Sequence, residues 1–81
     1  MRDPHAARAA QIAQDAEVDP IAVARLTAGR PPARTTPAER QEATAILTSQ
    51  GLSGRLIADR LHVTERTVFR LRARQQRKAS A

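Results

Sequence analysis

The sequence predicts an all-helical fold for this 81-residue chain. Helix-start signals, each a small polar residue ahead of a proline or apolar positions, recur at Asp19, Thr36, Ser53 and Thr64. The apolar residues that follow them are spaced three and four apart, as on one face of a helix. No alternating run of apolar and polar residues is long enough for a strand. We therefore expect short helices stacked through a small aliphatic core.

The first predicted helix covers about 20–28. Asp19 and Pro20 make an N-cap and first-turn pair, and Gly29 is a stop signal. The segment 30–34 contains two consecutive prolines and cannot be helical, because proline lacks a backbone donor and extends the residue before it. This segment is expected to be a linker or an extended arm.

Three further helices are predicted over about 37–50, 54–61 and 65–76. Thr36 and Glu39 have the spacing of a capping box, in which each side chain bonds to the backbone of the other residue. Apolar positions at helical spacing follow in each segment, with Leu56, Ile57 and Leu61 expected to face inward in the second. Together these helices form a predicted trihelical unit.

The chain divides into four predicted segments. They are a flexible or frayed helical N-terminus at 1–17, a short helix with a Pro-rich linker at 18–35, the trihelical unit at 36–76 and a basic tail at 77–81.

The positive charge is concentrated in the last third of the chain. Residues 1–50 carry six basic and six acidic side chains, whereas residues 51–81 carry eight basic and two acidic ones. Most of the excess is Arg, whose planar fork suits phosphates and guanine edges. This pattern predicts a polyanionic partner, with a solvated, solubilising tail as the alternative.

Several classes of function are disfavoured by composition. The chain has no cysteine, so it has neither disulfides nor a thiolate zinc site. It offers only His5 and His62 and scattered carboxylates, so we expect no enzyme, cofactor, metal site or small-molecule substrate. No apolar stretch approaches the roughly 20 residues of a membrane span, and no signal peptide is evident. We expect a cytoplasmic, nucleoid-associated protein.

The segment from Gly54 to Ala73 resembles the helix-turn-helix of bacterial DNA-binding proteins, in the homeodomain-like form of resolvase C-terminal domains and small actinobacterial or phage regulators. The apolar core positions of that motif are occupied here by Ile57, Leu61, Val63, Val68 and Leu71. Ala58 stands where a small residue lets two helices cross closely. His62 stands at the turn position that often holds a glycine with positive φ, a conformation that His tolerates at some cost.

The resemblance implies that the helix beginning at Glu65 enters the major groove. Arg66 and Arg70 are spaced to reach guanines. Phe69 either fills the core beside Leu71 or touches a thymine methyl group. Glu65 either accepts from cytosine or interacts favourably with the helix dipole.

The resemblance also implies contacts to the DNA backbone. The expected residues are Ser53, Arg55, Thr64 and Thr67 at the helix starts, with Arg72, Arg74, Arg77 and Lys78 further along. Arg30 and Arg34 form either a minor-groove arm or a solvated linker.

The function expected from the sequence is sequence-specific binding of double-stranded DNA as a transcriptional regulator. The alternatives are an accessory factor in phage or plasmid recombination or replication, and a helical protein-docking module. Because one recognition helix reads only about 4 to 6 base pairs, we also expect a homodimer, through the first helix and the N-terminal segment, or a larger protein partner.

Overall fold

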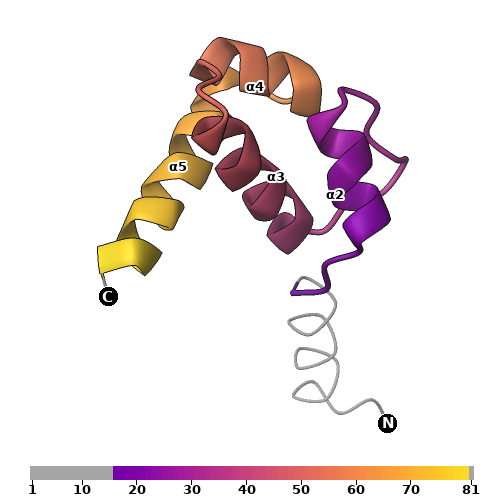
Figure 1. Cartoon of the computed structure of the whole chain (residues 1–81), viewed down its shortest axis with the longest axis horizontal. Helices are drawn as coiled ribbons and strands as arrows, with labels where there is room; N and C mark the ends of the chain where they lie inside the picture. The colour runs from indigo at the N-terminus through magenta and orange to yellow at the C-terminus, as the bar shows by residue number, and fades with distance from the viewer. Residues whose placement is uncertain (1–15, 81) are drawn as a thin grey trace, which may run out of the picture.

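The computed structural model describes residues 16–80, with side chains as far as Arg77, and this part of the chain is all helical. Its helices are α2 (Pro20–Thr27), α3 (Pro37–Ser49), α4 (Gly54–Leu61) and α5 (Glu65–Ser80) (Figure 1). The all-helical prediction is thus confirmed for the described residues. Most of the N-terminal segment predicted to be frayed, residues 1–15, lies outside them.

The helices begin where the capping residues predict. Asp19 accepts a hydrogen bond from the Ile21 N–H at 2.9 Å, and Ser53 accepts one from the Leu56 N–H at 3.3 Å. The capping box at the start of α3 is present in both directions. At the other end of the fold, α5 continues to Ser80, beyond the predicted end at 76, so most of the predicted basic tail is helical.

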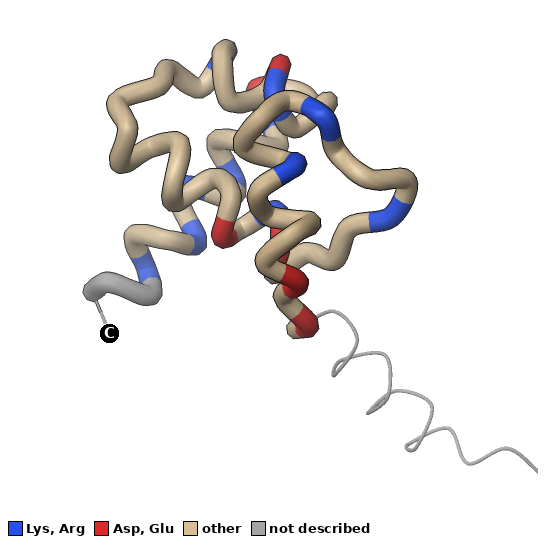
Figure 2. The backbone as a smooth tube through the Cα atoms, turned by 45° about the vertical axis from the view of Figure 1, so that its right-hand side comes forward, with Lys and Arg blue, Asp and Glu red and all other residues tan. Residues whose placement is uncertain are grey.

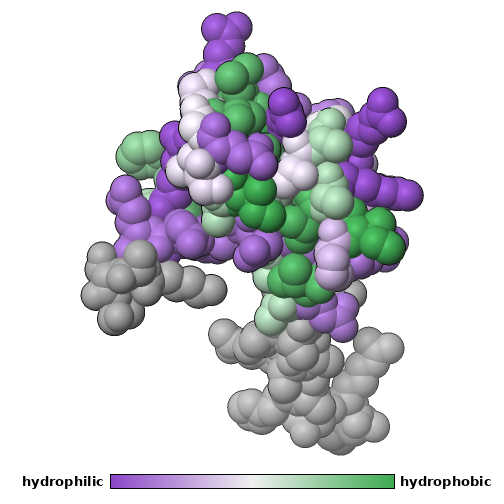
Figure 3. Space-filling view, viewed as in Figure 1, coloured by the Kyte–Doolittle hydropathy of each residue, from purple (hydrophilic) through white to green (hydrophobic). Residues whose placement is uncertain are grey.

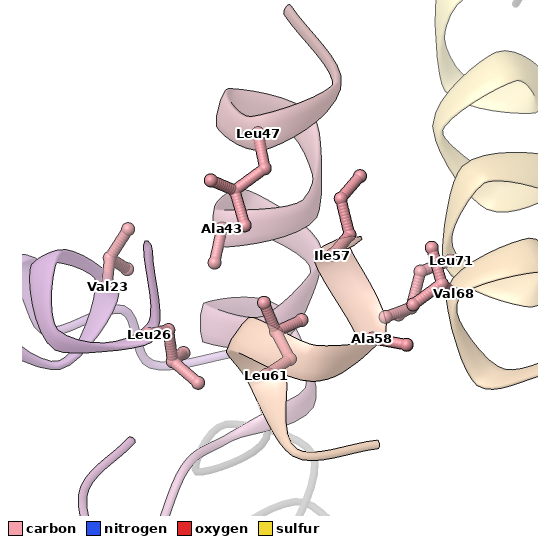
Figure 4. Close-up of a cluster of buried hydrophobic side chains, with 9 residues drawn as sticks. All are labelled: Val23, Leu26, Ala43, Leu47, Ile57, Ala58, Leu61, Val68 and Leu71. Carbon is pink, nitrogen blue, oxygen red and sulfur yellow. The ribbon is translucent and has the colours of Figure 1, made fainter. Parts of the chain in front are cut away.

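The core is a single cluster of aliphatic side chains shared by all four described helices. Its buried members are Val23, Leu26, Ala43, Leu47, Ile57, Ala58, Leu61, Val68 and Leu71 (Figure 4). In Figure 1, α3 lies between α2 and α5, and α4 crosses one end of the bundle. Leu56 was expected to face inward, but it is 53% exposed, because the buried face of α4 is narrow and is filled by Ile57, Ala58 and Leu61.

Polar side chains fix both ends of α2. The buried carboxylate of Glu39 accepts hydrogen bonds from the N–H groups of Thr36 and Asp19, both at 2.8 Å, which joins the starts of α3 and α2. These hydrogen bonds, that from Thr36 first, hold the pKa of Glu39 below its usual 4.5 against the opposing effect of burial. At the far end of α2, Arg60 of α4 donates to the Thr27 carbonyl at 2.7 Å.

Candidate functional site

A left-handed turn joins α4 to α5. His62 has φ 56° and ψ 44°, so the turn residue has the positive φ that the sequence predicts. The N–H groups of His62 and Val63 both donate to the Ala58 carbonyl. Ala58 is itself buried on the side of α4 that faces α5 (Figure 4). A larger side chain at this position would separate the two helices.

Helix α5 has two chemically different sides. The outer face, as we define it here, consists of Arg66, Phe69, Arg70, Arg74 and Arg77, all of which are exposed. Their spacing of three and four residues places them on one side of the helix, and the buried Val68 and Leu71 lie on the other. Phe69 is 75% exposed, so the alternative in which it fills the core is wrong. The outer face therefore combines positive charge with one large apolar side chain.

The arginines of the outer face are available to a ligand. Among the described residues, none of them is held by a hydrogen bond or an ion pair within the chain. Arg55, exposed near the start of α4, shares this property. Figure 2 shows how basic positions follow one another along α5. The predicted contact residue Lys78 lies where side chains are not described.

Arg72 differs from the other arginines of α5 because it points back into the protein. Its Nε donates to the Thr48 hydroxyl at 3.2 Å, and its Nη2 donates to the Leu52 carbonyl at 2.8 Å. These contacts attach the end of α3 and the following turn to α5. Two of its donors are thus used inside the fold, and Arg72 is not part of the outer face.

The hydroxyl groups predicted to meet phosphates have roles in the helix starts. Ser53 caps α4, and Thr64 caps α5 by accepting from the Thr67 N–H at 3.2 Å. The hydroxyls of Thr64 and Thr67 also bond to each other at 3.0 Å. Glu65 is exposed in the first turn of α5, where a negative charge interacts favourably with the helix dipole.

Arg30 and Arg34 are exposed in the loop between α2 and α3. This loop starts beside α4, since a Cβ added to Gly29 would lie 3.9 Å from the Cα of Arg60. Neither arginine side chain is bonded within the described part of the chain, so both are available to a ligand.

Sequence reasoning missed several long-range polar contacts, including that of Gln41 with Leu71, and three of them involve charged side chains. These are the bonds from Arg60 to Thr27, from Arg72 to Thr48 and Leu52, and from Asp19 to Glu39. Each joins residues at least 20 positions apart, and no local pattern marks such a pair.

The described residues offer neither a metal-binding cluster nor a helix that could span a membrane. No group of three or more His, Cys, Asp or Glu side chains is placed there to hold a metal ion. None of the helices within 16–80 is both long and apolar enough to cross a membrane. Comparisons with family models, with curated proteins and with solved structures found no match to the chain.

Proposed function

We propose that this protein binds double-stranded DNA in a sequence-specific manner, with α4 and α5 acting as a helix-turn-helix. The observation that carries the proposal is the outer face of α5. Arg66 and Arg70 are exposed one turn apart, beside the exposed ring of Phe69, and neither guanidinium is used by the fold. A helix that presents such a face fits the width of the major groove.

The first turns of α5 would carry the base-reading residues. Arg66 and Arg70 each have the paired donors that bind the O6 and N7 atoms of guanine, a contact worth about 1 to 3 kcal/mol of discrimination. Phe69 lies between them in sequence and offers apolar contact to a thymine methyl group. Glu65 would accept from the amino group of cytosine. A site that contains G next to T is therefore the expected target.

Phosphate contacts would come from the residues around this centre. Arg74 and Arg77 continue the outer face along α5, and Arg55 flanks it on α4. The backbone N–H groups at the starts of both helices add donors for phosphate oxygens. Arg30 and Arg34 would extend the contact as an arm into the minor groove. These interactions would fix the register of the protein without selecting the sequence.

We infer a role in regulating transcription, in the cytoplasm at the nucleoid. An accessory role in phage or plasmid recombination or replication would use the same contacts. Both roles need a specific site on duplex DNA, so the binding experiment comes before any distinction between them.

The test is selection of bound duplexes from a random pool by the purified chain at two salt concentrations. Sequence-specific recognition predicts an enriched motif that survives at the higher salt, because base contacts release no counterions. Weak binding that disappears at higher salt without any motif would contradict the proposal and would favour a protein-docking module.

Two matched variants, tested by the same selection from a random pool, show which residues contact the bases. Arg66→Ala should relax the motif at one guanine position. Arg74→Ala removes the same charge from the same helix two turns later, and should weaken binding to all duplexes alike. If both variants left the motif unchanged, the start of α5 would not be the reading element.

A further inference from the structure

The outward side of α2 carries an apolar strip that no described part of the chain covers. The α2 strip, as we define it, is Ile21, Ala24 and Ala28, which share one side of the helix at spacings of three and four. Ile21 is 66% exposed, and the three residues line a shallow depression together with Pro20, Arg25 and Arg30. Figure 3 shows hydrophobic surface on this side of the molecule.

The charges around the α2 strip reverse from one end to the other. Glu17 and Asp19 are exposed just before α2, whereas Arg25 and Arg30 are exposed in and after its last turn. Figure 2 shows the acidic positions at one end of α2 and the basic positions at the other. An inverted copy of this surface would set Glu17 and Asp19 against Arg30, while Arg25 of the two copies would lie near each other at the centre.

We propose that the α2 strip is a self-association surface, on which α2 of a second copy of this chain packs antiparallel about a two-fold axis. In this arrangement Ile21 of each copy lies over Ala28 of the other, and the alanines allow the helices to approach closely. Asp19 and Glu17 of each copy face Arg30 of the other, so in the dimer only Arg34 is left as an arm toward DNA. A parallel pair would bring like charges together, so the charge pattern selects the antiparallel one.

The size of the strip limits the strength of this contact. A helix of eight residues presents less than the roughly 800 Å² per partner found in stable interfaces. We therefore expect a dimer weaker than about micromolar. The pairing itself does not depend on DNA. Its consequence, the placing of two α5 helices on one duplex, rests on the function proposed above.

Sedimentation equilibrium of the full chain, at concentrations up to about 1 mM, tests the pairing. The wild type should show a monomer–dimer equilibrium. Ile21→Glu should weaken the dimer by about tenfold or more, because it buries a charge at the contact. Leu56→Glu, at a comparably exposed leucine of α4, should leave the equilibrium unchanged. Circular dichroism of each variant checks that the helices are retained.

A charge exchange tests the antiparallel geometry. Glu17→Arg places two repelling pairs in the dimer and Arg30→Glu places four, because Glu17 and Asp19 both face position 30. Each variant should weaken self-association by about tenfold or more. A mixture of the two variants forms a mixed dimer in which both contacts between positions 17 and 30 are attractive again. Only one contact, between Asp19 and the substituted position 30, still repels, so the mixture should associate more tightly than either variant alone.

Three results would overturn the proposal. One is a wild-type chain that stays monomeric throughout, as it would if residues 1–15 or a different protein occupied the strip. Another is a dimer that Ile21→Glu does not weaken, and the third is a mixture that associates no more tightly than either variant alone. None of these measurements uses DNA, so a negative result would not affect the DNA-binding proposal. In the same way, a failure to bind DNA would not affect the self-association proposal.

Discussion

The two sides of α5 contrast sharply although their residues alternate in the sequence. Val68 and Phe69 are neighbours, yet Val68 is 1% exposed and Phe69 is 75% exposed. Arg70 extends into solvent, while Arg72 is bonded to α3 and to the turn after it. The inner side contributes to stability. The outer side contributes little to the fold, and its charge and aromatic ring are available for a ligand.

Not all of the positive charge in the last third of the chain is available to a ligand. The last third of the chain carries eight basic residues, but Arg60 and Arg72 are used to join helices. A count of charges therefore overstates what is available to a polyanion. Variants on each side of α5 test this distinction.

The largest expected effect is on stability from the inner side. Leu71→Ala removes a buried side chain from the core and should lower the free energy of unfolding by about 2 to 5 kcal/mol. Phe69→Ala removes a larger side chain from the outer side and should change it by no more than about 0.5 kcal/mol. Urea denaturation measures both. Similar losses in the two variants would mean that Phe69 belongs to the core.

The two arginines should behave in opposite ways. Arg72→Ala removes two hydrogen bonds and should cost about 1 to 2 kcal/mol of stability, whereas Arg70→Ala should cost almost nothing. On DNA, Arg70→Ala should relax the selected motif, and Arg72→Ala should not. Thermal melts and random-pool selection on the same samples provide the data. If Arg72→Ala left the protein folded but altered the selected motif, Arg72 would be a DNA-reading residue and not a purely structural one.

A smaller effect is expected from pH at the junction of α2 and α3. Because its hydrogen bonds keep the pKa of Glu39 low in the folded chain, the unfolded chain binds the proton more readily. The ionised Glu39 carboxylate contributes its full stabilisation at pH values above its usual pKa of 4.5. This contribution is lost as pH falls through the lowered pKa of the folded state. Glu39→Gln should therefore lose less stability on acidification than the wild type, as measured by urea titrations across this range.

The matched control for this prediction is Glu42→Gln, at an exposed position of the same helix. It should follow the wild-type dependence on pH. An identical acid profile for Glu39→Gln and the wild type would show that the junction does not depend on the charge of Glu39.

The smallest expected effect is on the salt dependence of DNA binding. Arg77→Ala removes one phosphate contact from the far end of the outer face and should reduce the logarithmic salt slope by about 1, equally for all duplexes. Fluorescence anisotropy at several salt concentrations measures the slope. An unchanged slope would place the end of α5 away from DNA.

The sequence predicted what local chemistry decides. The helix starts at Asp19, Thr36 and Ser53 depend on bonds within three residues, and the positive φ of His62 follows from the short turn. In the candidate site, the helical repeat places Arg66 and Arg70 on the side of α5 away from Val68, so their exposure could be predicted from the sequence. Their contact with DNA stays a prediction.

What the sequence could not decide depends on how the helices meet. Leu56 and Ile57 are equally apolar, and only the position of α3 and α5 determines which of them is buried. The same holds for Arg70 and Arg72, since the partners of Arg72 lie in the α3–α4 region. The carboxylate of Glu39 was predicted to close its own capping box, but its second bond, to Asp19, exists only after α2 has packed.

Amide chemical-shift mapping shows which residues of the chain meet DNA, and we expect them on the outer face of α5. The isotope-labelled full chain would be titrated with a duplex from the selected pool. We predict that the largest shift changes lie between Thr64 and Ala73, with smaller ones at the start of α4. Changes centred on α2, with α5 unaffected, would show that α5 is not the DNA-binding helix.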